Sequence, residues 1–133
     1  MARKAATPED TETTWCPAIV ALQRVIGGKW KIEILFYICL EGIHRFGQLK
    51  RRLGDISEST LSKQLRELVA DGFLERVDFG EVPPRVEYRL TERAEGFTPI
   101  LQAMWDWSEH SFDFSTSERE QMRAYRERLS TRG

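Results

Sequence analysis

GDISESTLSKQLRELVADGFLER, residues 54–76, is the stretch that decides the fold of this chain. Its apolar side chains recur at i, i+4, i+7 and i+8, the spacing of one face of an α-helix. They are Leu61, Leu65, Leu68 and Val69. Ser57 stands just before them as an N-cap, and Gly72 follows them as a residue that tolerates the left-handed region. The stretch therefore predicts an amphipathic helix over residues 57–71.

The face opposite this stripe carries hydroxyls, amides and cations, which suit phosphates and the edges of bases. The candidate DNA contacts on this helix are Ser57, Ser59, Thr60, Lys63, Gln64 and Arg66. A strand-like run from Phe73 to Val77 follows at once. A helix that leads directly into a strand is what a winged helix-turn-helix requires, so we expect this face to lie in a major groove. The alternative, a merely solvated helix face, is disfavoured by the wing that follows.

Two helical patterns open the chain before this motif. The first runs from Pro17 to Ile26 and stops at Gly27-Gly28. The second, from Lys29 to Leu40, is apolar over most of its circumference, so we expect it to be the central buried helix. Residues 43–45 are expected to form a short edge strand.

A third helical pattern, from Phe46 to Leu53, is the expected positioning helix of the helix-turn-helix. Its apolar residues repeat at i, i+3 and i+7, and Gly54 closes it. Its other face carries the cations Lys50, Arg51 and Arg52. These cations either stay in water or clamp phosphates, and their place on the positioning helix favours the clamp.

Residues 74–79 and 85–90 are the two predicted strands of the wing. The tip between them contains Pro83 and Pro84, which cannot donate to a strand ladder. The second strand alternates apolar and charged residues, which predicts one buried and one wet face. Arg85, next to the stiff tip, is either a solubilising edge charge or a contact to phosphate or a narrow minor groove, and we favour the contact.

An apolar stripe follows the wing in a helix for which Thr91 is the expected N-cap. The stripe consists of Phe97, Ile100, Leu101, Met104 and Trp105. It is larger than the wing can cover, so a dimer core explains it better than ordinary core or a cofactor pocket. The box Ser117–Glu120 then predicts the start of a last helix that extends to about Leu129.

Composition bounds the remaining possibilities. A chain of 133 residues suits one domain. We expect a flexible arm at residues 1–14, the domain at 15–114 and a helical tail at 115–133. Without a run of about 18 apolar residues or a secretory signal, a cytoplasmic protein is expected. Cys16 and Cys39 with two histidines are too few for a structural zinc site, and no catalytic constellation is recognisable, so neither metal, cofactor nor enzymatic activity is expected.

The charge distribution matters more than the net charge of −1. Residues 29–66 contain eight Lys or Arg against four acids, whereas residues 106–120 contain five acids and one Arg. This asymmetry indicates one side that faces DNA and one that is turned away from it.

Seven short motifs together resemble the HxlR-type bacterial transcriptional regulators, which are similar to the MarR type. In order, they are Cys16-Pro17, Gly28-Lys29-Trp30, RFGQL at 45–49, Ile56-Ser57, LSKQLREL at 61–68, DGFLER at 71–76 and VPPRVEYRLT at 82–91. The resemblance covers residues 16 to about 110. Ala94 departs from it, because the family usually has glycine there, and the tail from Ser115 lies outside the shared pattern.

The resemblance implies a mainly α-helical, dimeric winged helix-turn-helix in the order α-α-β-α-α-β-β-α-α. It implies that the homodimer forms through the first helix and the helix after the wing, and that it binds double-stranded DNA at a pseudo-palindromic operator. The corresponding interface residues here are Trp15, Ile19, Leu22, Phe97, Leu101, Met104 and Trp105. The alternative function is a winged-helix adaptor between proteins that does not bind DNA.

Cys16 is the candidate sensor of an oxidant or another small-molecule effector. It precedes Pro17 at a helix N-terminus, where free amides and the helix dipole favour the reactive thiolate. Several members of the family that the chain resembles use the cysteine of this Cys-Pro pair in that way. The alternative is that Cys16 is a small packing residue near the dimer interface. Cys39, within an apolar helix face, is expected to be inert.

Overall fold

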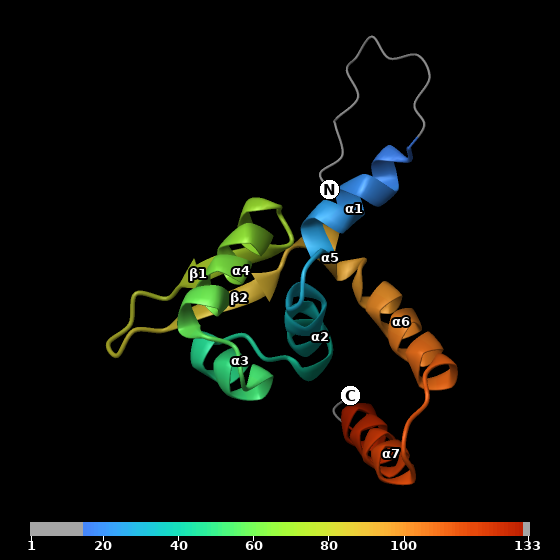
Figure 1. The fold of residues 1–133 in the computed structure, drawn as a ribbon. Coiled ribbons are helices and arrows are strands. Elements are labelled where there is room, and N and C mark those ends of the chain that lie inside the picture. Colours follow the sequence, from blue (N-terminus) through green and yellow to red (C-terminus); the bar gives the residue numbers. More distant parts are fainter. Residues whose placement is uncertain (1–14, 132–133) are drawn as a thin grey trace.

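The structure, a computed structural model, describes residues 15–131, so the arm predicted at 1–14 lies outside the described residues. Its elements are α1 (Pro17–Ile26), α2 (Lys31–Glu41), α3 (Phe46–Leu53), α4 (Glu58–Ala70), β1 (Leu74–Asp78), β2 (Val86–Leu90), α5 (Glu92–Glu95), α6 (Thr98–Ser111) and α7 (Thr116–Ser130). In Figure 1, α3, α4 and the two strands lie on one side of α2, and α6 and α7 lie on the other. The predicted winged helix-turn-helix is confirmed.

The core forms around α2, as its apolar circumference predicts. Ile34, Leu35 and Ile38 of this helix are almost completely buried. The leucine stripe of α4 packs into the same cluster, with Leu61, Leu65 and Leu68 fully buried. Burying a leucine side chain contributes about 1.5 to 3 kcal/mol, so this stripe fixes which face of α4 remains outside.

The wing is a two-stranded antiparallel sheet in which Leu74 pairs with Leu90 and Asp78 pairs with Val86. Gly72, with φ of 78°, makes the turn between α4 and β1. Thr91 closes the base of the wing, because its hydroxyl donates to the Gly72 carbonyl oxygen at 2.7 Å. The helix and the wing are therefore joined rigidly.

Two details of the wing differ from the sequence predictions. Residues 43–45 form no separate strand, and only a single bridge pairs Arg45 with Glu87. Glu87 was predicted on the wet face, but it is 8% exposed. It is buried because the segment before α3 lies against β2, where the Tyr88 amide donates to the His44 carbonyl oxygen at 2.8 Å.

The helix predicted after the wing is interrupted. Thr91 does act as an N-cap, but it caps the short α5, and α6 begins separately at Thr98. Pro99 explains the break, since proline lacks an amide hydrogen and is tolerated only in the first turn of a helix.

The last helix begins earlier than predicted. Ser115, not Ser117, is its N-cap, and it forms the capping box with Glu118. The sequence contains the Ser-x-x-Glu pattern twice, and the first copy is the one used. α7 packs on α2 and α6 through Tyr125, whose ring lies 6.3 Å from Phe36 and 5.6 Å from Trp105. No helix among residues 15–131 has the length and apolar character needed to cross a membrane.

Candidate nucleic-acid interface

The outer face of α4 is the centre of the candidate interface. Because the leucine stripe is buried, Ser59, Lys63 and Arg66 are exposed, and Thr60 and Gln64 are half-buried beside them. The sequence prediction for which side of this helix faces outward is therefore confirmed for these five residues. Two cations and three polar groups on one exposed helix face suit phosphates and base edges.

Ser57 has a structural role at the beginning of α4. Its Oγ accepts a hydrogen bond from the Thr60 amide at 3.1 Å and donates to the Thr60 hydroxyl at 2.8 Å. The predicted N-cap is confirmed. The Ser57 hydroxyl therefore has a capping role, and a DNA contact by Ser57 stays a prediction.

An ion pair between a buried lysine and a partly exposed glutamate joins α4 to α2, and sequence reasoning missed it. Lys31 of α2 is 6% exposed, and its Nζ lies 2.8 Å from Oε1 of Glu67 on α4. Hydrogen bonding to Lys31 lowers the pKa of Glu67, so the carboxylate stays charged. Lys31 had been counted with the cations of the DNA side, but it holds α4 to the core. A lysine in the first turn of an apolar helix gives no sequence signal of this pairing.

The three cations of α3 have different surroundings. Lys50 is half-buried and Arg51 is exposed. Arg52 donates from Nε and Nη2 to the two Glu41 oxygens, both at 2.9 Å, and its guanidinium lies 4.2 Å from the centroid of the Tyr37 ring. This bidentate pair further raises the already high pKa of Arg52. Arg52 is therefore held by Glu41, which leaves it less available than Arg51 for the phosphate contact predicted from the sequence.

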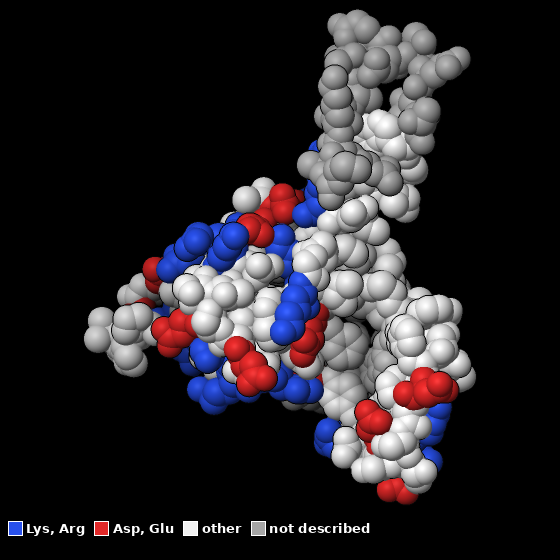
Figure 2. Space-filling model, in the orientation of Figure 1, with Lys and Arg blue, Asp and Glu red and all other residues white. Residues whose placement is uncertain are grey.

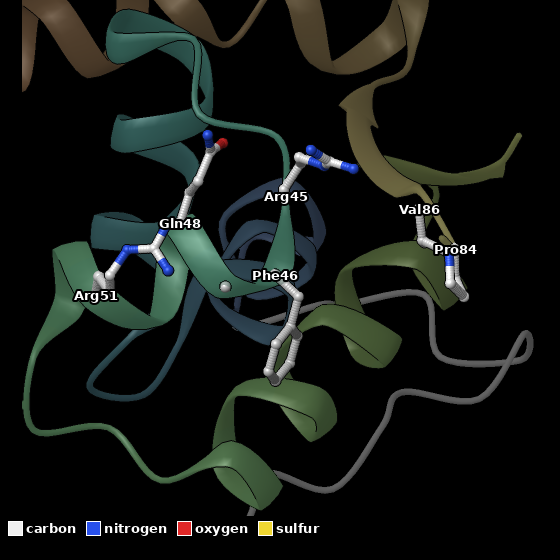
Figure 3. A pocket seen from close by; sticks show the side chains of 7 residues that line it. Arg45, Phe46, Gln48, Arg51, Pro84 and Val86 are labelled. Carbon is white, nitrogen blue, oxygen red and sulfur yellow. The ribbon is translucent and has the colours of Figure 1, made fainter. Parts of the chain in front are cut away.

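A hollow of about 420 Å³ separates α3 from the wing. Its lining includes Arg45, Gln48 and Arg51 on one side and Pro84 and Val86 on the other. Figure 3 shows Gln48 and Arg51 projecting from α3, and Arg45 extending from the preceding segment toward the wing. Arg45 and Gln48 were absent from the predicted site, although they belong to the RFGQL motif.

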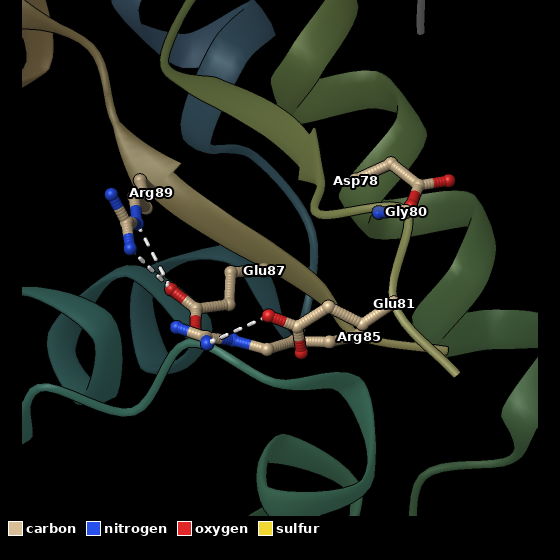
Figure 4. A network of polar contacts seen from close by, with 6 residues as sticks. All are labelled: Asp78, Gly80, Glu81, Arg85, Glu87 and Arg89. Atoms are coloured by element: carbon tan, nitrogen blue, oxygen red, sulfur yellow. Dashed lines mark hydrogen bonds and ion pairs between the residues drawn. The ribbon is translucent and has the colours of Figure 1, made fainter. Parts of the chain in front are cut away.

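Glu87 organises the cations of the wing, as Figure 4 shows. Its Oε1 accepts from Arg89 at 2.7 Å, and its Oε2 accepts from Arg85 at 3.0 Å. These hydrogen bonds, that of Arg89 first, lower the pKa of Glu87. The Arg85 guanidinium also lies 3.9 Å from the centroid of the Phe79 ring. Arg85 is thus positioned at the base of the tip, while Val82 at the tip is 97% exposed.

The cations that the sequence analysis assigned to a DNA-facing side lie largely on the surface. In Figure 2, Lys and Arg side chains gather over α3 and α4, with acidic residues between them. Figure 1 places these helices beside the wing. The exposed cations Arg51, Lys63 and Arg66 on this side favour association with a polyanion.

The residues predicted at a dimer interface differ in exposure and form three groups. Phe97 and Leu101 are 7% and 2% exposed and belong to the core of one protomer, which corrects their assignment. Trp105 is half-buried under α7, where Arg126 lies 4.1 Å from its ring centroid. Trp15, Leu22 and Met104 are also half-buried. Ile19 remains 61% exposed on α1, and Ile100 is 50% exposed on α6.

The two cysteines differ in their access to solvent. Cys16 is exposed and is the N-cap of α1, followed by Pro17. Cys39 is half-buried, and this burial raises the pKa of its thiol. Within residues 15–131, no cluster of His, Cys, Asp and Glu is suited to a metal ion.

Comparisons with known proteins agree with this geometry. The family model described as HxlR-like helix-turn-helix matches residues 25–116. The HTH-type transcriptional regulator YybR of Bacillus subtilis is 44% identical over 104 residues, which are 78% of this chain and 82% of that protein. The redox regulator HypR in its oxidized form is 43% identical, with a TM-score of 0.65 over 74% of this chain and all of that one. Its reduced form is 40% identical, with a TM-score of 0.63 over 81% and 99% of the two chains.

These relatives are transcriptional regulators, which confirms the expectation that the chain is not an enzyme and does not favour an adaptor without DNA binding. The match covers the helix-turn-helix, the wing and α6, but it ends where α7 begins. The chain belongs to the HxlR-like helix-turn-helix family of DNA-binding transcriptional regulators.

Proposed function

We propose that this regulator acts as a homodimer on a pseudo-palindromic operator, with α4 of each protomer in one of two successive major grooves. The observation that carries the proposal is the exposed face of α4, where Lys63 and Arg66 stand opposite a fully buried leucine stripe. The wing and α3 border this face, and both carry further cations. Half-sites read in this way lie about one helical turn, roughly 34 Å, apart.

Exposed apolar residues outside the DNA-facing side support the dimer. Ile19 on α1 and Ile100 on α6 are each at least half exposed, on the two elements that the family resemblance implies for the interface. Covering them with a second protomer removes apolar surface from water. In this arrangement α1 and α6 set the spacing of the two recognition helices.

Binding to the DNA upstream of the protein's own coding sequence tests the proposal, with affinity measured by fluorescence anisotropy. Lys63→Ala and Arg66→Ala are each expected to cost about 1 to 3 kcal/mol if the side chains reach bases. Lys50→Ala is expected to reduce the salt dependence of binding. Arg123→Ala, which removes an exposed charge on α7, is the matched control and should leave binding unchanged. Unchanged affinity in the three test variants would show that another face binds DNA.

Cys16 is our proposed site of regulation by an oxidant or an electrophile. Its exposure at the N-terminus of α1 supports this, and the related HypR is described as a redox regulator. Modification there would shift α1 and thereby the spacing of the recognition helices. We expect a mild oxidant or a quinone to change the DNA affinity of the wild type and of Cys39→Ser, but not that of Cys16→Ser. An equal response in the Cys16→Ser variant would leave Cys16 as a packing residue.

A further inference from the structure

A second cavity, of about 500 Å³, lies between α2, α6 and α7, away from the candidate DNA interface. Its volume falls within the range of small-molecule sites in proteins. One of its three walls is α7, the helix that the family model does not cover. Neither the helix-turn-helix nor the wing uses this cavity, so it calls for an explanation of its own.

Aromatic side chains form much of the cavity wall. Phe36 and Trp105 meet edge to face at 5.4 Å, and the ring of Tyr125 stacks on Phe36 at an interplanar angle of 26°. Hydrogen bonds hold two of these rings in place, because Trp105 Nε1 donates to Glu109 at 2.9 Å and the Tyr125 hydroxyl donates to Glu41. Fixed aromatic walls favour a flat aromatic ligand. Met104 and Met122 supply the adaptable part of the lining.

The polar groups of the cavity indicate the charge of its ligand. Lys29 and Glu33 line it, and their charges cancel. Lys29 Nζ lies 4.8 Å from the centroid of the Trp30 ring, and Glu33 Oε2 accepts from the Tyr37 hydroxyl at 2.8 Å. A charged ligand would be attracted by one of these groups and repelled by the other, so an anion and a cation would each bear a desolvation cost without a net electrostatic gain. A hydroxyl group avoids both costs, since it donates to a carboxylate and accepts from an ammonium group.

We propose that the cavity between α2, α6 and α7 binds a neutral, planar aromatic compound that carries a hydroxyl group. The rings of Phe36, Trp105 and Tyr125 contact its faces and edge. Lys29 and Glu33 bind its hydroxyl group.

Occupancy of this cavity is connected to the DNA-facing side through Tyr125. The Tyr125 hydroxyl donates to Glu41, which in turn holds Arg52 of α3 at 2.9 Å. A ligand that packs against the Tyr125 ring therefore acts on its hydrogen bond to Glu41, and through Glu41 on the contact that fixes α3. This consequence for DNA binding rests on the proposed function, whereas ligand binding itself does not.

Calorimetric titration of the full chain without DNA tests the inference with three matched probes. They are 2-naphthol, which is neutral, 2-naphthoate, which is an anion, and 2-naphthylmethylammonium, which is a cation. We expect one 2-naphthol to bind per protomer, about tenfold more tightly than either charged probe. Because DNA is absent, failure of the operator assay leaves this result unaffected, and the two proposals can fail separately.

Two charge variants locate the bound probe. Glu33→Gln leaves Lys29 unopposed and is expected to shift the preference to 2-naphthoate by about tenfold. Lys29→Met is expected to shift it to 2-naphthylmethylammonium by a similar factor. Arg76→Met, which removes an exposed cation from β1, is the control and should keep the order of the wild type. The inference is overturned if no probe binds, which is also the result expected if a second protomer covers the cavity. It is overturned as well if neither variant changes the order of the affinities for the three probes.

Discussion

Arg51 and Arg52 are neighbours in sequence, and the structure predicts opposite consequences for their loss. Arg52→Ala removes two hydrogen bonds of 2.9 Å to Glu41 and the contact with the Tyr37 ring. Because the Arg52 side chain is 39% exposed, solvent screens the pair, and we expect a loss of roughly 1 to 2 kcal/mol in unfolding free energy. For a chain of this size that corresponds to a fall in Tm of about 4 to 7 °C.

Arg51→Ala should leave the unfolding free energy within about 0.5 kcal/mol of the wild type, since the side chain is exposed. If Arg51 binds a phosphate, the slope of log affinity against log salt falls by about 0.9 per contact, or about 1.8 for a dimer. Thermal melts and anisotropy titrations at several salt concentrations measure both quantities. The reasoning is refuted if Arg52→Ala lowers the salt slope as much as Arg51→Ala does, because Arg52 would then leave Glu41 to bind DNA.

Three further predictions concern the elements that hold the interface. Ser57→Ala should cost about 1 kcal/mol in chemical denaturation, and Ser57→Asp should restore most of it, because aspartate also caps. Leu65→Ala should cost about 2 to 5 kcal/mol, since the side chain is fully buried; a smaller loss would mean that α4 is not packed as described. The pKa of Glu87 is lower in the folded protein than in the unfolded chain. The ionised carboxylate therefore stabilises the fold fully at a pH above its unfolded-state pKa, and this stabilisation is lost as the pH falls through its folded-state pKa. NMR spectra of wing amides should show this acid transition, and Glu87→Gln should abolish it.

The sequence predicted most of the fold because its signals are local. The leucine period of α4, the Ser57 cap and the prolines between the two strands each correspond to an observed feature. The errors at α6 and α7 concern helix ends. Pro99 is compatible with a helix that begins near it, and the repeated Ser-x-x-Glu pattern offers two N-caps for α7. Local sequence does not decide between these helix starts, whereas packing does.

The candidate site was less predictable because it depends on pairings between distant residues. Lys31 with Glu67 and Arg52 with Glu41 join different helices, and charge patterns in one segment do not reveal the partner. Arg52 follows Arg51 on the same cationic face of the predicted helix, so sequence reasoning assigned the two residues the same role. Phe97 and Leu101 were assigned to a dimer because sequence periodicity cannot distinguish a protomer core from an interface.

Hydroxyl-radical footprinting on the DNA upstream of the coding sequence tests the central claim most directly. The account predicts two protected half-sites on one side of the duplex, centred about 34 Å apart. Both should disappear together in the Lys63→Ala/Arg66→Ala double variant at protein concentrations that saturate the wild type. Protection of a single, unpaired half-site by a monomer would contradict the account.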